Sequence, residues 1–172
     1  MNTTFSVSYN KSAVFSEVGT YVSGFVRIHS KDDSRPWGGF FVVEEDDAEK
    51  FIEQFFPNFN KEILSISGKL SPKILLVEPG KKLSWQYHHR RAEIWKLIAG
   101  RAGVIKSDDD DEKEVILLEP GDSVELKQGE RHRLIGLDQW GIVAEIWRHT
   151  DIENPSDEDD IVRLQDDFGR KS

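Results

Sequence analysis

The sequence contains no cysteine and a single methionine among its 172 residues. Without cysteine there is neither a disulfide framework nor a thiolate nucleophile or metal ligand. No apolar run approaches the roughly 18 residues of a membrane span, and the opening MNTTFSVSYN lacks the basic start and apolar core of a signal peptide. These absences predict a cytoplasmic protein that does not engage a membrane.

Clustered positive charge is also missing. The chain has 23 basic and 32 acidic residues, which gives a net charge of −9 at pH 7, and its lysines and arginines are scattered. Nucleic-acid binding proteins neutralise phosphates with gathered cations, so we do not expect a nucleic-acid partner. An anionic small molecule would bind only where a local cluster of cations outweighs the repulsion from the net negative charge of the chain.

Most of the chain has the pattern of β-strands. Segments rich in β-branched and aromatic residues are separated by Pro-Gly pairs and single glycines, which are turn signals. The pattern indicates an antiparallel sandwich or a closed barrel. The predicted strands cover residues 21–30, 38–45, 73–79, 93–100, 101–107, 114–121, 123–128, 131–137 and 141–148.

Two stretches depart from this pattern. DDAEKFIEQFFPNF (46–59) has apolar residues at positions 51, 52, 55 and 56, which is helical spacing, with Asp46 or Asp47 as the N-cap and Pro57 as the stop. The acidic run SDDDDEK (107–113) lies between two predicted strands, and we expect a solvated hairpin loop there.

The stretch QYHHRRAE (86–93) contains two of the five histidines of the chain at neighbouring positions. Because side chains alternate along a strand, Gln86 and His88 point to one face and His89 to the other. Glu93 begins the next strand. A lone His132 follows in a second Pro-Gly segment. If these groups face inward together they form a mixed nitrogen and oxygen site, which suits zinc, iron, manganese or nickel better than calcium.

The spacing in the first segment resembles the first cupin motif. It runs Gly80, five residues, Gln86, one residue, His88, four residues, Glu93, six residues, Gly100. Glutamine stands where the first histidine of that motif is usual.

The second segment resembles the second cupin motif, with Gly121 followed after five residues by Lys127 and with His132 closing it. Lysine replaces the usual proline, and Gly136 stands where asparagine is frequent. Together the two motifs imply a cupin jelly roll, an all-β double-stranded β-helix with one inserted helix. The implied metal ligands are Gln86, His88, Glu93 and His132. The alternative is a set of hydrogen-bonded core residues, because some cupins have lost their metal.

A glutamine in the ligand set is similar to the zinc site of phosphomannose isomerases. Three stretches resemble the type II isomerase domain, often fused behind a mannose-1-phosphate guanylyltransferase. They are RPWGGFFVVEE (35–45), PGKKLSWQYHHRRAEIWKLIAGRAGV (79–104) and DEDDIVRLQDDFGR (157–170). The resemblance implies a zinc-dependent isomerase that interconverts mannose 6-phosphate and fructose 6-phosphate through a cis-enediol. The length of the sugar stays open.

The sequence also departs from that family. No guanylyltransferase-like stretch accompanies the domain, so nucleotide transfer is not expected. Ile94 replaces a usual histidine, and strand parity turns it away from the ligands. We expect one cupin domain over 1–172. Its parts are an N-terminal extension (1–34), a helical insertion (46–72), a cupin core (73–150) and a C-terminal segment (151–172).

Four further residues are candidates for catalysis and substrate binding. Glu145 lies among apolar residues in GIVAEIWR and is the expected general base, unless it faces solvent. Arg91 and Arg163 match cationic positions of the family, and either is expected to stabilise the enediolate or hold phosphate, with a surface ion pair as the alternative. Trp37 is expected to wall the sugar site or to be a core residue.

Two other functions stay open. One is a non-catalytic sugar-binding or regulatory cupin, and the other is an iron-dependent cupin dioxygenase. The strand-like sequence of residues 1–30 also predicts a homodimer, because sheet edges need covering.

Overall fold

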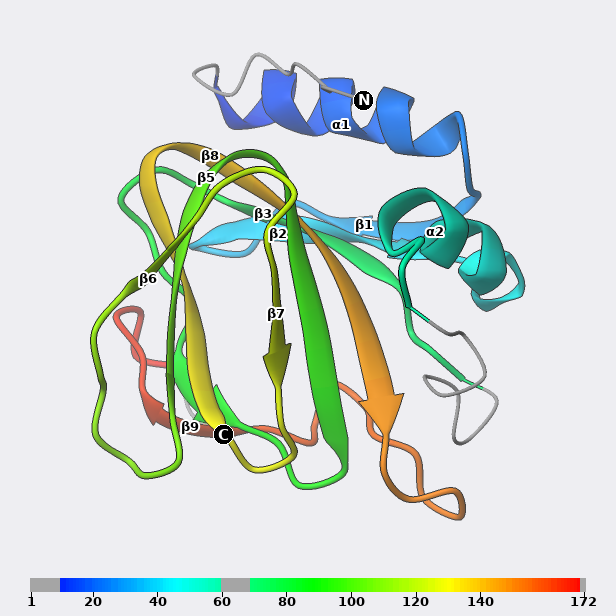
Figure 1. Cartoon of the computed structure of the whole chain (residues 1–172). Coiled ribbons are helices and arrows are strands. Elements are labelled where there is room, and N and C mark those ends of the chain that lie inside the picture. The colour runs from blue at the N-terminus through cyan, green and yellow to red at the C-terminus, as the bar shows by residue number, and fades with distance from the viewer. Residues whose placement is uncertain (1–9, 60–68, 171–172) are drawn as a thin grey trace.

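The computed structural model describes residues 10–59 and 69–170. In these residues nine strands form one strongly curved sheet, and two helices lie against its outside (Figure 1). The elements are α1 (Lys11–Ser23), β1 (Ile28–Asp32), β2 (Gly38–Val43), a 3-10 turn η1 (Glu45–Asp47), α2 (Ala48–Phe55), β3 (Lys73–Val77), β4 (Trp85–Tyr87), β5 (Arg91–Ser107), β6 (Ile116–Leu118), β7 (Ser123–Leu126), β8 (Arg131–His149) and β9 (Val162–Gln165).

The two longest strands organise the sheet. β5 and β8 pair antiparallel from Arg91 opposite His149 to Ser107 opposite Arg131. On its other edge β8 pairs with β3 and then with β4, so the strand order is β1-β2-β3-β8-β4-β9, while β5 also carries β6 and β7. Both ends of the long pair curl round a common interior (Figure 1). This arrangement confirms the predicted cupin jelly roll.

Two glycines explain why four of the predicted strands form only two strands, β5 and β8, in the structure. Gly100 has φ +75° and lies beside register shifts in the β5–β8 ladder, so it makes a bulge where the sequence indicated a turn. A Cβ on Gly136 would lie 2.0 Å from the carbonyl oxygen of Glu78, so this glycine permits close backbone approach. The predicted strands 93–100 and 101–107 merge into β5, and 131–137 and 141–148 merge into β8.

The strand predicted over 21–30 is wrong in its first half. α1 extends to Ser23, and β1 begins only at Ile28. The side chain of Asn10 caps α1 by accepting a hydrogen bond from the backbone N–H of Ala13 at 2.9 Å. The buried face of the helix recurs with helical period and packs on the sheet, which outweighs local β propensity. Its members are Val14, Phe15, Val18 and Val22.

The predicted helix in 46–59 is confirmed as α2, which ends two residues before Pro57. Asp47 precedes it, as predicted, but its carboxylate does not cap the helix. Instead it accepts hydrogen bonds from the backbone N–H, Nε and Nη2 of Arg27 at 2.7, 3.0 and 3.1 Å. Residues 108–113 of the acidic run form an exposed connection between β5 and β6, as predicted, while Ser107 is the buried last residue of β5.

The expected division of the chain stays a prediction. α2 falls inside the predicted insertion, and the flanking strands β2 and β3 pair directly from Gly38 opposite Val77. The homodimer through residues 1–30 also stays a prediction, and the apolar face of α1 packs within its own chain. In the ranges 10–59 and 69–170, neither helix has the length and hydropathy needed to cross a membrane.

Candidate metal centre

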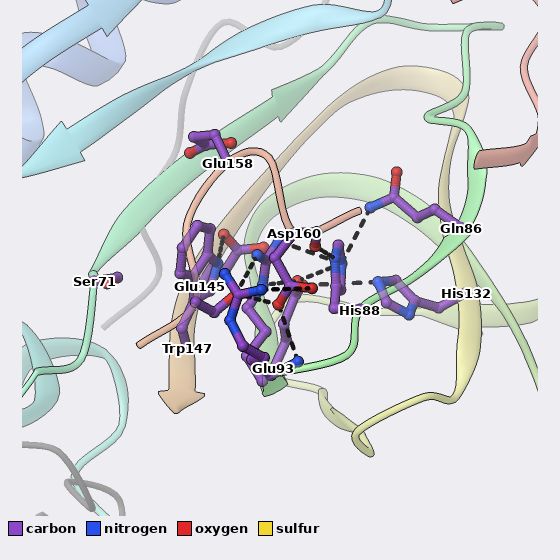
Figure 2. Close-up of polar contacts among 12 residues, drawn as sticks. Ser71, Gln86, His88, Glu93, His132, Glu145, Trp147, Glu158 and Asp160 are labelled. Atoms are coloured by element: carbon purple, nitrogen blue, oxygen red, sulfur yellow. Dashed lines mark hydrogen bonds and ion pairs between the residues drawn. The ribbon is translucent and has the colours of Figure 1, made fainter. Parts of the chain in front are cut away.

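The structure brings the four predicted ligands near one another (Figure 2). Gln86 on β4 lies opposite His132 on β8, His88 follows β4, and Glu93 lies on β5. One donor atom from each of His88, Glu93 and His132 lies within 4.8 Å of the other two. All four side chains are buried. Their role as ligands stays a prediction.

Both imidazoles are held in one orientation by backbone carbonyls. Nδ1 of His88 lies 2.7 Å from the carbonyl oxygen of Asp160, and Nδ1 of His132 lies 2.8 Å from that of Glu130. A carbonyl oxygen only accepts, so each Nδ1 carries a proton and each Nε2 faces the cluster. Metal-bound histidines in proteins are fixed by the same kind of hydrogen bond.

The atoms that converge are acceptors. Nε2 of His88 lies 2.9 Å from Oε1 of Glu93, and Nε2 of His132 lies 3.9 Å from Oε2. Within the described ranges, Nε2 of His132 has no hydrogen-bond partner. A buried lone pair that faces a carboxylate, as at His132, is costly unless a cation or proton lies between the two, so the arrangement fits a metal ion.

The protonation states agree with this fit. Burial tends to raise the pKa of Glu93, but its interactions with His88 and Arg91 outweigh it and hold that pKa well below its usual value. Burial lowers the pKa of His132 to about 4, against the opposing effect of Glu93. Near neutral pH the site therefore offers a carboxylate and a neutral imidazole, the forms that bind metal.

Gln86 is the exception among the four. Its Nε2 lies 3.5 Å from Nε2 of His88, while its Oε1 accepts a hydrogen bond from Oγ of Ser84 at 2.5 Å. An amide binds a metal through oxygen, the atom here bonded to Ser84. Rotation about the Cγ–Cδ bond would exchange the two atoms, and Ser84 Oγ would then accept from Nε2. Three potential metal-ligand atoms thus converge as the structure stands. The fourth, Oε1 of Gln86, joins them only after this rotation of the amide.

Arg91 lies beside the ligands, because strand alternation places it on the same face as Glu93. Its Nε donates to Oε1 of Glu93 at 2.9 Å, and its Nη1 donates to Oγ of Ser156 and to the carbonyl of Asp157, both at 2.9 Å. Its guanidinium centre lies 3.6 Å from the centre of the Trp147 ring. The cation is therefore fixed on several sides and links the ligands to the C-terminal segment.

Glu145 faces the cavity rather than solvent. Trp95 Nε1 donates to its Oε2 at 2.7 Å, and Trp147 Nε1 donates to its Oε1 at 2.8 Å. Burial raises the pKa of Glu145 to about 8, with a further contribution from the negative charge of Glu93 and an opposing one from Lys73. The result is a carboxyl group held in one orientation that exchanges a proton near neutral pH.

A cavity of about 80 Å³ adjoins these residues. Trp37 and Arg163, both predicted for substrate binding, line it together with Gln86, Arg91, Glu93 and Glu145. Sequence reasoning missed three further cations in its wall, which are Arg35, Lys73 and Arg170. A signal for Lys73 existed, because it occupies the same strand face as Leu75 in the apolar segment KILLV.

The fold and these donors define the class: a cupin with a candidate mixed-ligand metal centre. The chain belongs to the family described as "Mannose-6-phosphate isomerase C-terminal", whose model matches residues 44–166. This confirms the resemblance drawn from the two motifs and the C-terminal stretch.

Curated relatives support the assignment. The chain is 34% identical over 138 residues to "Xanthan biosynthesis protein XanB" of Xanthomonas campestris pv. campestris (strain B100), covering 79% of this chain and 23% of the relative. It is 30% identical over 149 residues to "Mannose-1-phosphate guanylyltransferase" of Escherichia coli (strain K12), covering 84% and 24%. The chain thus spans about a quarter of the length of these relatives.

Solved structures show the likeness of fold alone. The capsular polysaccharide assembling protein CapF from Staphylococcus aureus matches with a TM-score of 0.52 at 14% identity, over 81% of this chain and 34% of that one. Vicilin from Solanum lycopersicum matches with a TM-score of 0.50 at 17% identity, over 78% and 33%.

Proposed function

We propose that the chain is a metal-dependent aldose–ketose isomerase that interconverts mannose 6-phosphate and fructose 6-phosphate. The observation that carries the proposal is the meeting of His88, Glu93 and His132 within one buried cluster, next to the oriented carboxyl group of Glu145. Membership of the family supports the substrate, a phosphorylated hexose.

Gln86, His88, Glu93 and His132 would hold the divalent cation, for which zinc is our first expectation. A bound cation supplies Lewis-acid stabilisation of negative charge on the sugar oxygens. Two neutral imidazoles, one amide and one carboxylate leave the centre net positive, which suits that task.

Glu145 is proposed as the residue that moves the proton. The reaction transfers a proton between C2 and C1 through a cis-enediol, so one group must take it and return it. Two indole N–H donors fix both oxygens of Glu145, and burial favours its protonated form. A carboxyl group whose pKa lies near the working pH suits both steps.

Arg91 is proposed to stabilise the charge of the enediolate, because its guanidinium is buried and fixed beside Glu93. Arg163 is proposed to bind phosphate, and Trp37 to pack against the sugar. Both residues line the cavity, which supports these roles. We further propose a cytoplasmic homodimer, for which sedimentation of the purified protein is the test.

The deciding experiment measures metal content and conversion of mannose 6-phosphate to fructose 6-phosphate on the same protein. We expect turnover in the zinc-loaded chain. Arg91→Ala should keep the metal, because guanidinium is not a ligand, yet lose roughly 10²-fold in turnover. Metal-loaded protein that converts no hexose or heptose phosphate would instead be a sugar-binding cupin. Oxygen consumption by the iron-loaded protein would indicate an oxygenase.

A further inference from the structure

Lys73 is a buried cation that the proposed chemistry does not use. Its side chain is 7% exposed on β3, and its ammonium lies 4.4 Å from the centre of the Trp147 ring and 4.9 Å from that of Phe40. Its ion-pair partner is the carboxylate of Glu158, far along the chain in the segment between β8 and β9. A buried ammonium needs such a partner, because isolated buried charge is costly.

Besides Arg91, three arginines line the same cavity as Lys73, namely Arg35, Arg163 and Arg170. Burial lowers the pKa of Arg163, and the positive charges of Arg170 and Arg35 lower it further. Arg35 and Arg170 each have a carboxylate partner, Asp32 and Asp166. With Arg91 these are five cations at one cavity in a chain of net charge −9, which is the local gathering that an anionic ligand requires.

The cavity as it stands is small, with a volume of about 80 Å³. A larger groove of about 370 Å³ lies beside it, and the two share Lys73, Trp147 and Glu158 as a common wall. Glu158 is the part of this wall that can leave most easily, because its side chain is 59% exposed and regains water on release.

We propose that, in the protein without substrate, the carboxylate of Glu158 occupies the position that the anionic group of the substrate takes on binding. A phosphate binds Lys73 together with Arg35, Arg163 and Arg170, displaces the Glu158 carboxylate, and thereby joins the cavity to the neighbouring groove. The inference rests on the proposed function, since it assigns the site of the phosphorylated end of that substrate. A phosphate group offers several strong acceptor oxygens and suits a mixed lysine and arginine site.

The test is calorimetric titration with inorganic phosphate and with mannose 6-phosphate at fixed ionic strength. Glu158→Gln removes the competing charge, so both ligands should bind roughly 2- to 5-fold more tightly, the range expected for an exposed ion pair. Asp159→Asn is the matched control: it is an exposed neighbour, removes the same charge, and should leave both affinities at the wild-type value.

Lys73→Met keeps most of the buried stem and removes the ammonium. It should weaken phosphate binding by about 10-fold or more. If a folded Lys73→Met protein binds phosphate with wild-type affinity, Lys73 is not part of the anion site. If this variant fails to fold, the comparison of Glu158→Gln with Asp159→Asn decides alone, and equal affinities in those two variants overturn the displacement.

Binding and turnover separate this inference from the proposed function. Protein that shows the expected changes in phosphate affinity but converts no sugar phosphate would retain the anion site and lose the isomerase assignment. Protein that isomerises mannose 6-phosphate, with Glu158→Gln binding no tighter than Asp159→Asn, would keep the isomerase and lose the inference.

Discussion

The two faces of the paired strands β5 and β8 use neighbouring residues for opposite purposes. On the outer face Ile94 lies opposite Ile146, and both are buried in the cluster that includes the apolar faces of α1 and α2. One residue along, on the inner face, Trp95 lies opposite Glu145 and donates to it. The outer pair needs only apolar burial, whereas the inner pair needs a specific partner for each polar atom. Substitutions on the inner face should therefore alter metal binding or turnover. Substitutions on the outer face should alter stability alone.

The largest effect is expected at the metal centre. His88→Ala removes a ligand and also the hydrogen bond to the Asp160 carbonyl. We expect loss of bound metal and a fall in turnover of more than about 10²-fold, since even residues that only support a ligand can cost that much. Metal content by atomic emission, measured beside turnover, checks this. His89→Ala is the control, because His89 is exposed and should behave as wild type. Full metal content in His88→Ala would remove it from the ligand set.

Glu145→Gln should affect catalysis without removing the metal. Loss of the ionisable group should reduce turnover by about 10²- to 10⁴-fold. The amide also turns its NH₂ toward one of the two indole N–H donors, so we expect a loss of about 1–3 kcal/mol in the free energy of unfolding. Metal content, turnover and urea denaturation separate the three quantities. Turnover near the wild-type value would exclude Glu145 as the base.

Ile146→Ala tests the outer face at the position next to Glu145. The side chain is fully buried, so its truncation should lower the free energy of unfolding by about 2–5 kcal/mol. Metal content and the Michaelis constant of the folded protein should stay at the wild-type values. Urea denaturation gives the first quantity, and metal analysis with kinetics gives the others. A loss of metal equal to that of His88→Ala would show that the two faces are coupled.

The contrast between the faces also explains what the sequence predicts. Strand alternation places Arg91 with Glu93 and turns Ile94 outward, and the structure agrees on both. These relations are local, because each depends on a spacing of two residues or fewer. The motif spacing then adds the jelly roll, whose strands bring His132 to His88.

The contacts that sequence reasoning missed are long-range. The carbonyl of Asp160 orients His88 across 72 positions, and Glu158 reaches Lys73 across 85. The spacing of residues within a strand or helix does not predict that the C-terminal segment packs back across the site. α1 was missed for another reason: its apolar spacing is helical, but the β-branched residues at its end favoured a strand.

The smallest effect is expected at Asp47, in the outer layer. Arg27 holds the pKa of this buried carboxyl at about 2, below its ordinary value, through hydrogen bonds and charge. A depressed pKa in the folded state stabilises the fold above the unfolded pKa near 4, and this contribution is lost as the pH falls through about 2. Asp47→Asn should therefore lower the Tm at neutral pH, and its difference from wild type should shrink between about pH 4 and pH 2. Asp46→Asn removes the same charge at an exposed position and should show no such trend. A difference that stays constant over that range would mean that the stabilisation by Asp47 does not depend on its ionisation.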